Sequence, residues 1–113
     1  QLLDRKQPSE SNYSAVISCI RYIEQHLADD IGTKDLVKVA ALSQSSLYNA
    51  FKLHTGMPVR QYITQRRIQQ SLRLLREGMS IADAAAAVGF QDFSTYYRNF
   101  VKCPKAARTY RAI

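Results

Sequence analysis

The side chains with the most chemistry to offer are amides, hydroxyls and guanidinium groups, and they gather in two short segments. One segment surrounds the apolar residues Leu47 and Phe51, and the other surrounds Tyr96 and Phe100. Within each pair the residues are four positions apart, so both lie on one face of a helix and leave the opposite face to polar side chains. Groups that donate and accept hydrogen bonds from a helix face suit the recognition of a polar partner.

The two outward faces define the candidate contact residues. They are Gln44, Ser45, Tyr48, Asn49 and Lys52 in the first segment, and Ser94, Thr95, Tyr97 and Arg98 in the second. The amide of Asn49 can pair bidentately with adenine, and the planar fork of Arg98 fits either the O6 and N7 atoms of guanine or a phosphate. Phe93 borders the second face; a base contact is one possibility for it, and we expect it instead to cap the core from the loop because exposed Phe is uncommon. The alternative for either face is an ordinary solvated helix surface.

The formal net charge of +7 lies entirely in the second half of the chain. Residues 57–113 hold ten Lys and Arg against three acidic residues, whereas residues 1–56 hold six of each. Uneven basic charge of this kind indicates a polyanionic partner, nucleic acid first and an anionic membrane second. Arg66 and Arg67 are candidates for phosphate contacts, while other arginines of the same stretch solubilise it or pair with Glu77.

Helix starts offer a second kind of phosphate contact. Ser43 and Ser80 each precede a helical pattern, where unpaired backbone N–H groups can meet a phosphate. Simple capping of the helix is the alternative at each serine.

Several function classes lack their residues in this sequence. It contains no pair of catalytic carboxylates, no metal-ligand cluster, no glycine-rich phosphate loop and no nucleophile elbow, so we expect neither an enzyme nor a metal or cofactor. Cys19 and Cys103 lie far apart without a CxxC motif, which fits a reducing, cytoplasmic location without a disulfide. No apolar run is long enough to cross a bilayer, so the protein is expected to be soluble.

Helical periodicity covers most of the chain. The expected helices run from Tyr13 to Leu27, from a cap at Thr33 through Ala40, from Ser43 to Gly56, from Pro58 to Gly78, from Ser80 to Gly89, and onward from Asp92. No segment alternates as a strand would, so the predicted class is all-α. Residues 1–12 are polar and lack periodicity, which predicts a linker or disordered arm. The conformation of the tail, residues 101–113, stays open.

The pattern of a short helix, a tight turn and a second helix occurs twice. The anchors Leu47 and Phe51 superpose on Tyr96 and Phe100 with a constant offset of 49 residues. A helix-turn-helix needs a turn residue that tolerates positive φ, and Gly89 supplies it in the second copy. In the first copy Ala41 stands at this position, at a cost on the order of 1 kcal/mol. A single copy also fits an unrelated helical hairpin, but two matching copies favour a duplicated helix-turn-helix.

These segments resemble the AraC/XylS family of transcription regulators across residues 13–113. The resemblance is carried by Leu47-Tyr48-Asn49-Ala50-Phe51-Lys52 with Thr55-Gly56, by Gln61-Tyr62-Ile63 with Arg66-Arg67-Ile68, by Ile81-Ala82-Asp83 through Val88-Gly89-Phe90, and by Phe100 and Tyr110-Arg111. Ser45, Tyr48 and Asn49 match positions that read bases in that family. The chain departs from the family after Phe100, where a glycine is missing and Ala107 stands in place of a proline.

The resemblance implies a DNA-binding domain made of two helix-turn-helix subdomains, residues 13–56 and 79–113, joined by a long linker helix over residues 57–78. The expected partners are a double-stranded DNA operator and RNA polymerase, with an effector or dimerisation domain upstream in the full protein. Both recognition helices would enter adjacent major grooves of one operator. The alternative is a helical interaction module, or a binder of polyanions or membrane surfaces that reads no bases.

Overall fold

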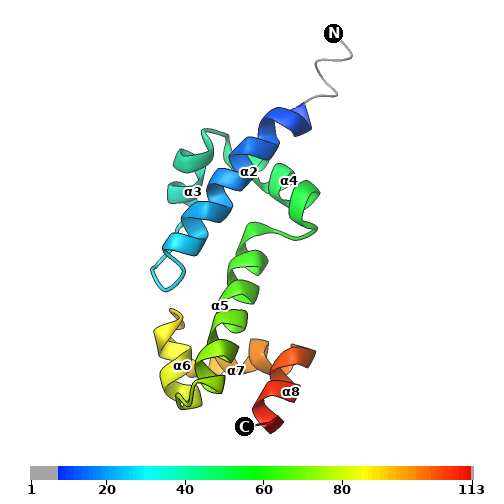
Figure 1. Ribbon diagram of the computed structural model, residues 1–113. Helices are drawn as coiled ribbons and strands as arrows, with labels where there is room; N and C mark the ends of the chain where they lie inside the picture. The colour runs from blue at the N-terminus through cyan, green and yellow to red at the C-terminus, as the bar shows by residue number, and fades with distance from the viewer. Residues whose placement is uncertain (1–7, 113) are drawn as a thin grey trace. The chain divides into compact units, whose positions relative to one another are not determined.

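The computed structural model describes residues 8–112, and over this range the chain forms seven helices and no strand, which confirms the all-α prediction. The helices are α2 (Pro8–Gln25), α3 (Thr33–Ala40), α4 (Gln44–Thr55), α5 (Val59–Arg76), α6 (Ile81–Ala87), α7 (Phe93–Val101) and α8 (Pro104–Ala112) (Figure 1). Within the described range, none of them has the length and apolar character required to span a bilayer.

The chain divides into two compact units. Unit 1 comprises the residues up to His26 together with Ile31–Tyr62, and unit 2 comprises Leu27–Asp30 together with Ile63–Ile113. The long helix α5 therefore contributes its first turn to unit 1 and the rest of its length to unit 2. Most of the buried residues of α5 belong to the core of unit 2. The division into subdomains 13–56 and 79–113 with a linker helix over residues 57–78 stays a prediction.

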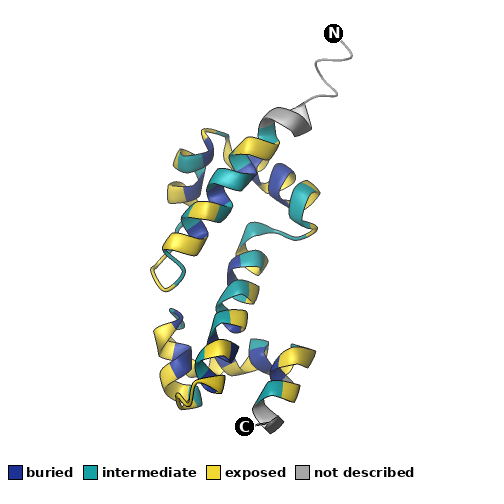
Figure 2. Ribbon diagram, in the orientation of Figure 1, coloured by how far each residue is buried: buried dark blue, intermediate teal, exposed yellow. Residues whose placement is uncertain are grey.

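Unit 1 is built on α2, which packs against both α3 and α4, while α3 also packs against α4. Each of these helices has a buried strip and an exposed strip (Figure 2). The buried strips consist of Val16, Cys19 and Ile23 from α2, Leu36 and Ala40 from α3, and Leu47, Ala50 and Phe51 from α4. Burial of these apolar groups is the main stabilising contribution to the unit.

Caps fix where α3 and α4 begin. The backbone N–H of Gly32 donates to the Asp35 carboxylate over 3.1 Å, so Gly32 is the N-cap of α3 and the prediction of Thr33 as the cap is wrong by one residue. An acidic side chain at the third helical position can fill this role from inside the helix. At α4 the predicted cap is confirmed, because the Ser46 N–H donates to the Ser43 hydroxyl over 3.2 Å.

Unit 2 is built on the remainder of α5. Its core consists of Ile68, Leu72 and Leu75 from α5, Ala84 and Ala85 from α6, Tyr96 and Phe100 from α7, and Ala106 from α8. One polar pair is buried with them: the hydroxyl of Ser71 lies 2.6 Å from the Ile68 carbonyl, to which it donates, and 2.9 Å from the Tyr96 hydroxyl. Because Ser71 donates to the carbonyl, Tyr96 donates to Ser71, and both hydroxyls are satisfied in the core.

Both ends of the chain are more helical than the pattern predicts. Helix α2 begins at Pro8, so the predicted arm over residues 1–12 is wrong for its last five residues, and residues 1–7 lie outside the described range. Proline suits the first turn of a helix, and the polar residues after it give no hydrophobic period to detect. The tail that the sequence leaves open forms α8, which packs against α7. The side chains of Ala107, Tyr110 and Arg111 are outside the described set.

Candidate nucleic-acid interface

The turn of unit 1 is closed by an alanine in a left-handed conformation. Ala41 has φ 56° and ψ 39°, and its backbone N–H donates to the Val37 carbonyl over 2.9 Å. Among the described residues other than glycine, it is the one with positive φ. The turn lets α4 leave α3 at an angle while Leu47 and Phe51 anchor α4 in the core, which confirms the first helix-turn-helix.

The exposed face of α4 contains the whole first candidate set. Gln44, Ser45, Tyr48, Asn49 and Lys52 are all exposed. The ammonium group of Lys52 lies 6.0 Å from the ring centroid of Tyr48, at the outer limit for a cation–π contact. The structure thus brings an amide, hydroxyls and a positive charge together on one helix face, the combination that matches base edges and phosphates.

The turn of unit 2 depends on Gly89 for two reasons. Its φ is +100°, and a Cβ atom built at this position would lie 2.9 Å from the carbonyl oxygen of Ala28. Behind the turn, the ring of Phe90 packs edge to face on the ring of Tyr96 with centroids 5.2 Å apart. The predicted second helix-turn-helix is therefore confirmed, with the close approach to Ala28 as an additional requirement for glycine.

On α7 a short chain of hydrogen bonds leads toward Arg98. The Asp92 carboxylate accepts from the Ser94 N–H over 3.3 Å and from the Thr95 hydroxyl over 2.9 Å. The Thr95 oxygen in turn accepts from the Arg98 guanidinium over 3.4 Å. The hydrogen bond from Thr95 lowers the pKa of Asp92, with a smaller contribution from the Ser94 N–H. Ser94, Tyr97 and Arg98 are exposed, whereas Thr95 is half-buried with its hydroxyl proton committed to Asp92.

Phe93 does not lie in the core as the sequence predicts. It is the first residue of α7 and remains 46% exposed, with its ring stacked near that of Tyr97 at a centroid distance of 6.0 Å. It touches the core only at the edge, where its ring centroid lies 5.9 Å from that of Tyr96. The loop before α7 is closed instead by Asp92, which caps the helix and leaves Phe93 outside.

Arg67 is bound within unit 2. Its Nε atom donates to the Leu27 carbonyl over 2.8 Å and its Nη2 atom to the Asp29 carbonyl over 2.6 Å. Burial lowers the pKa of this guanidinium, and the nearby charges of Asp30 and Asp29 oppose that effect. These charge-assisted hydrogen bonds engage two of the five guanidinium N–H donors and give Arg67 a structural role, while its phosphate contact stays a prediction.

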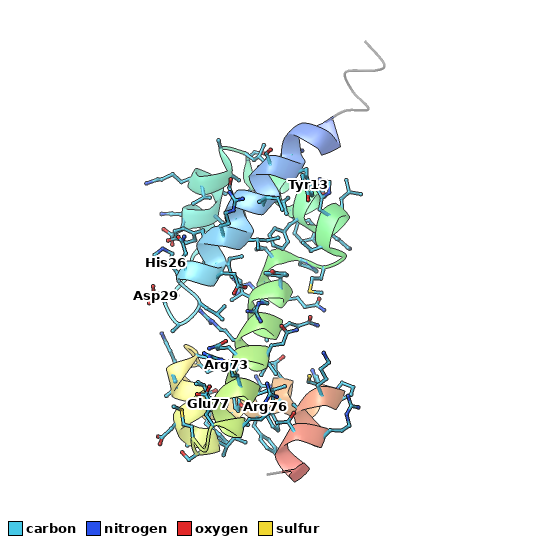
Figure 3. The ribbon with its side chains drawn as sticks, in the orientation of Figure 1. Tyr13, His26, Asp29, Arg73, Arg76 and Glu77 are labelled. Atoms are coloured by element: carbon cyan, nitrogen blue, oxygen red, sulfur yellow. The ribbon has the colours of Figure 1, made fainter. Side chains whose placement is uncertain are left out.

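The other predicted phosphate contacts, Arg66, Ser43 and Ser80, differ in their burial and in their hydrogen-bond partners. Arg66 is half-buried and donates from Nη1 to the Gln69 side chain over 2.7 Å. Ser80 is exposed and caps α6 by accepting from the Asp83 N–H over 3.1 Å, as Ser43 does for α4. Both serine hydroxyls retain a proton to donate. Arg73 lies in the last turn of α5 and Glu77 directly follows the helix (Figure 3), with 3.6 Å between Nη1 and Oε2, which confirms the predicted pairing of a helix arginine with Glu77.

Cys19, His26 and His54 belong to neither of the two exposed recognition faces. The Cys19 thiol is buried and lies 3.6 Å from the Leu36 carbonyl, and burial raises its pKa to about 11. The ring of His54 packs against Tyr13 of α2 and that of His26 against Tyr22, at centroid distances of 5.2 and 4.3 Å. Among the described residues, no group of three or more His, Cys, Asp or Glu could hold a metal ion.

Sequence reasoning missed two contributors to the second face. Asp92 was expected only to precede a helix, although its spacing of three from Thr95 is the signal for a side-chain cap that also orients a hydroxyl. Ser71 was missed because a lone serine in an apolar helix pattern gives no sign of its partner, and Tyr96 is 25 residues away. The Ser71–Tyr96 bond ties α7 to α5 inside unit 2.

Two helix-turn-helix units with exposed, hydrogen-bonding second helices define a DNA-binding protein of the helix-turn-helix class. A family profile described as a helix-turn-helix domain matches residues 36–106, which is well over half of the chain. The chain belongs to the AraC family of transcription regulators and forms their DNA-binding domain. Family membership places it among regulators of transcription and not among enzymes.

Similar proteins support the same assignment. The chain is 31% identical over 100 residues to a probable transcriptional regulator, LumQ, of Photobacterium leiognathi, a match that covers 88% of this chain and 39% of LumQ. It is 31% identical over 112 residues to the Msm operon regulatory protein of Streptococcus mutans, covering 94% and 40% of the two chains. It is 30% identical over 93 residues to the transcriptional activator RhaS of an Enterobacter strain, covering 79% and 34%. The chain thus spans between a third and two fifths of the length of these relatives.

Proposed function

We propose that the chain binds double-stranded DNA in a sequence-specific manner by inserting α4 and α7 into adjacent major grooves of one operator. The observation that carries the proposal is the exposure of the two predicted faces. Each is on the second helix of a helix-turn-helix, and every residue of the two sets is exposed except the half-buried Thr95. An exposed helix with amide, hydroxyl and guanidinium groups has the size and chemistry that the major groove accommodates.

The residues divide into base readers and phosphate contacts. Asn49 would pair with adenine, and Arg98 would contact guanine or a phosphate, with the neighbouring polar residues adding single hydrogen bonds. Ser43, Ser80 and Arg66 would contact phosphates and fix the register of each helix. Arg67 belongs to the predicted phosphate set as well; two of its donors bind the carbonyls of residues 27 and 29, so a phosphate contact would use its remaining N–H groups.

The matched relatives are much longer than this chain and are named as regulators of transcription. We infer that the chain serves as the DNA-binding part of a longer cytoplasmic protein, with an effector or dimerisation domain elsewhere in it. At its operator that protein would contact RNA polymerase.

A salt titration tests the proposal. The chain is offered a duplex that it has selected from a randomised pool and a scrambled duplex of equal length, and the dissociation constants are measured across salt concentrations. Log-linear salt dependence combined with a preference for the selected duplex supports base readout. Equal affinity for both duplexes and for anionic vesicles would mean a general polyanion binder instead.

Two substitutions assign the readout to the two helices. Asn49→Ala and Arg98→Ala should each cost about 1 to 3 kcal/mol on the selected duplex and relax discrimination at one base position. Arg108→Ala on α8 is the matched control for Arg98→Ala, because it removes the same charge from an exposed site on a helix other than the recognition helix. If Arg98→Ala and the control behave alike, α7 does not read bases through Arg98.

A further inference from the structure

The exposed side of α7 carries an apolar strip beside its polar residues. Phe93, Tyr97 and Val101 follow one another at intervals of four, so they lie along one side of the helix, and they are 46%, 50% and 53% exposed. The rings of Phe93 and Tyr97 are nearly parallel, with an interplanar angle of 23°. Large apolar side chains gathered on one face of a short helix indicate a binding surface more strongly than the same residues scattered singly.

The neighbours of this strip identify its partner. Ser94 and Arg98 each follow a strip residue by one position, about 100° further around the helix, on the side away from Tyr96 and Phe100. The strip therefore borders the polar side of α7 that carries Ser94 and Arg98, and Tyr97 is the strip residue next to Arg98 in the sequence. The strip is also too small for a protein partner by itself, because three side chains fall far short of the roughly 20 to 30 residues that each side of a stable protein interface contributes.

We infer that Phe93 and Tyr97 contact the C5 methyl groups of thymines, so that the half of the operator under α7 is selected for thymine as well as for the base or phosphate that Arg98 contacts. This inference rests on the proposed insertion of α7 into a major groove. The thymine methyl is the apolar group that base edges present there. The ring of Phe93 is wholly apolar, and the ring carbons of Tyr97 offer an apolar surface beside its hydroxyl, so both can pack on a methyl group.

Position on the helix distinguishes the members of the strip. The N-terminal residues of a recognition helix reach the base edges, and Val101 lies about 12 Å along the helix from Phe93. We therefore assign the methyl contact to Phe93 and Tyr97 and expect no contribution from Val101. Val101→Ala is the matched control, because it trims the same strip at its far end.

The test replaces thymine by uracil, which lacks only the methyl group and keeps the hydrogen-bonding pattern. In the duplex that the chain selects, each thymine is exchanged singly for deoxyuridine, and dissociation constants are measured with the 113-residue chain. At one or two positions under α7 the exchange should weaken binding about fourfold, the loss expected for one exposed methyl-sized group. Phe93→Ala should weaken binding to the thymine duplex and abolish this sensitivity, whereas Val101→Ala and Arg98→Ala should preserve it.

The failures of the two proposals are distinguishable. If the chain prefers no duplex, the proposed function fails. If it selects a duplex but every uracil exchange is neutral, or if Phe93→Ala retains the full uracil sensitivity, base readout stands and the thymine contact is refuted. Uracil exchange with the unmodified chain keeps the test valid even where Phe93→Ala perturbs the fold through its contact with Tyr96.

Discussion

Replacing Ala41 by glycine should stabilise unit 1, because Ala41 occupies a conformation that disfavours every residue with a Cβ atom. The left-handed region costs an L-residue about 1 to 2 kcal/mol, and glycine adopts it freely. Glycine also increases the conformational entropy of the unfolded chain, which lowers the free energy of unfolding by about 0.5 to 1 kcal/mol. With φ 56° and ψ 39° at Ala41, the net gain in the free energy of unfolding should be about 0.5 to 1 kcal/mol.

Urea and thermal denaturation followed by circular dichroism measure this gain. For a unit of this size the midpoint temperature should rise by about 3 to 6 °C, with an unchanged dependence on urea concentration. If the two units unfold in separate steps, only the step of unit 1 should move. An Ala41→Gly variant that is less stable than the parent would refute the left-handed turn.

Replacing a glycine of positive φ by alanine should have the opposite effect and lower the free energy of unfolding. Gly56 has φ +84° and nothing within 4 Å of an added Cβ atom, so Gly56→Ala measures the conformational cost alone, about 1 kcal/mol. Gly89→Ala adds the approach of Cβ to 2.9 Å from the Ala28 carbonyl oxygen and should cost clearly more. If both substitutions lowered the free energy of unfolding equally, the backbone at residue 28 would be able to move away from the added Cβ atom without an energetic cost.

Two further predictions concern buried groups. Arg67→Met should lower the free energy of unfolding by about 2 kcal/mol, because it removes the hydrogen bonds to the carbonyls of residues 27 and 29. The control Arg76→Met, on the exposed side of α5, should change it by less than about 0.5 kcal/mol. Unchanged stability of Arg67→Met together with weaker binding to all duplexes would mean that Arg67 acts on phosphates and not on the fold. Burial raises the pKa of Cys19 to about 11 from an ordinary 9.0, so the folded state favours the neutral thiol. Its contribution to stability is complete below pH 9 and is lost as the pH rises toward 11; the stability difference between the parent and Cys19→Ala should shrink over this window, and alkylation at pH 8 should be slower at Cys19 than at Cys103.

Hydrophobic periodicity sufficed for the helices and both turns because those features are local. The residues from Leu47 to Phe51 and from Tyr96 to Phe100 repeat the core pattern, and burial of the inward ones leaves the outward ones exposed. The same logic failed at Pro8, where the polar first turn of α2 gives no apolar spacing to detect, and at Thr33, where the start of α3 depends on the Asp35 side chain inside the helix. It also failed for Phe93, since hydrophobicity alone does not say whether the first residue of a helix faces the core.

The contacts between segments far apart in the chain could not be predicted from the sequence. Arg67 binds carbonyls 40 and 38 residues away, and Gly89 approaches the same short segment at Ala28. Residues 27–30 follow α2 in the chain but belong to unit 2. There the backbone carbonyls of Leu27 and Asp29 accept hydrogen bonds from the guanidinium of Arg67, which the basic composition of the segment alone would predict to contact a phosphate. A basic residue on a predicted DNA-binding helix is therefore a candidate phosphate contact only after the carbonyls within its reach are accounted for. By that criterion we propose that the DNA contacts of unit 2 centre on Arg98, which is exposed and donates a hydrogen bond to the Thr95 hydroxyl.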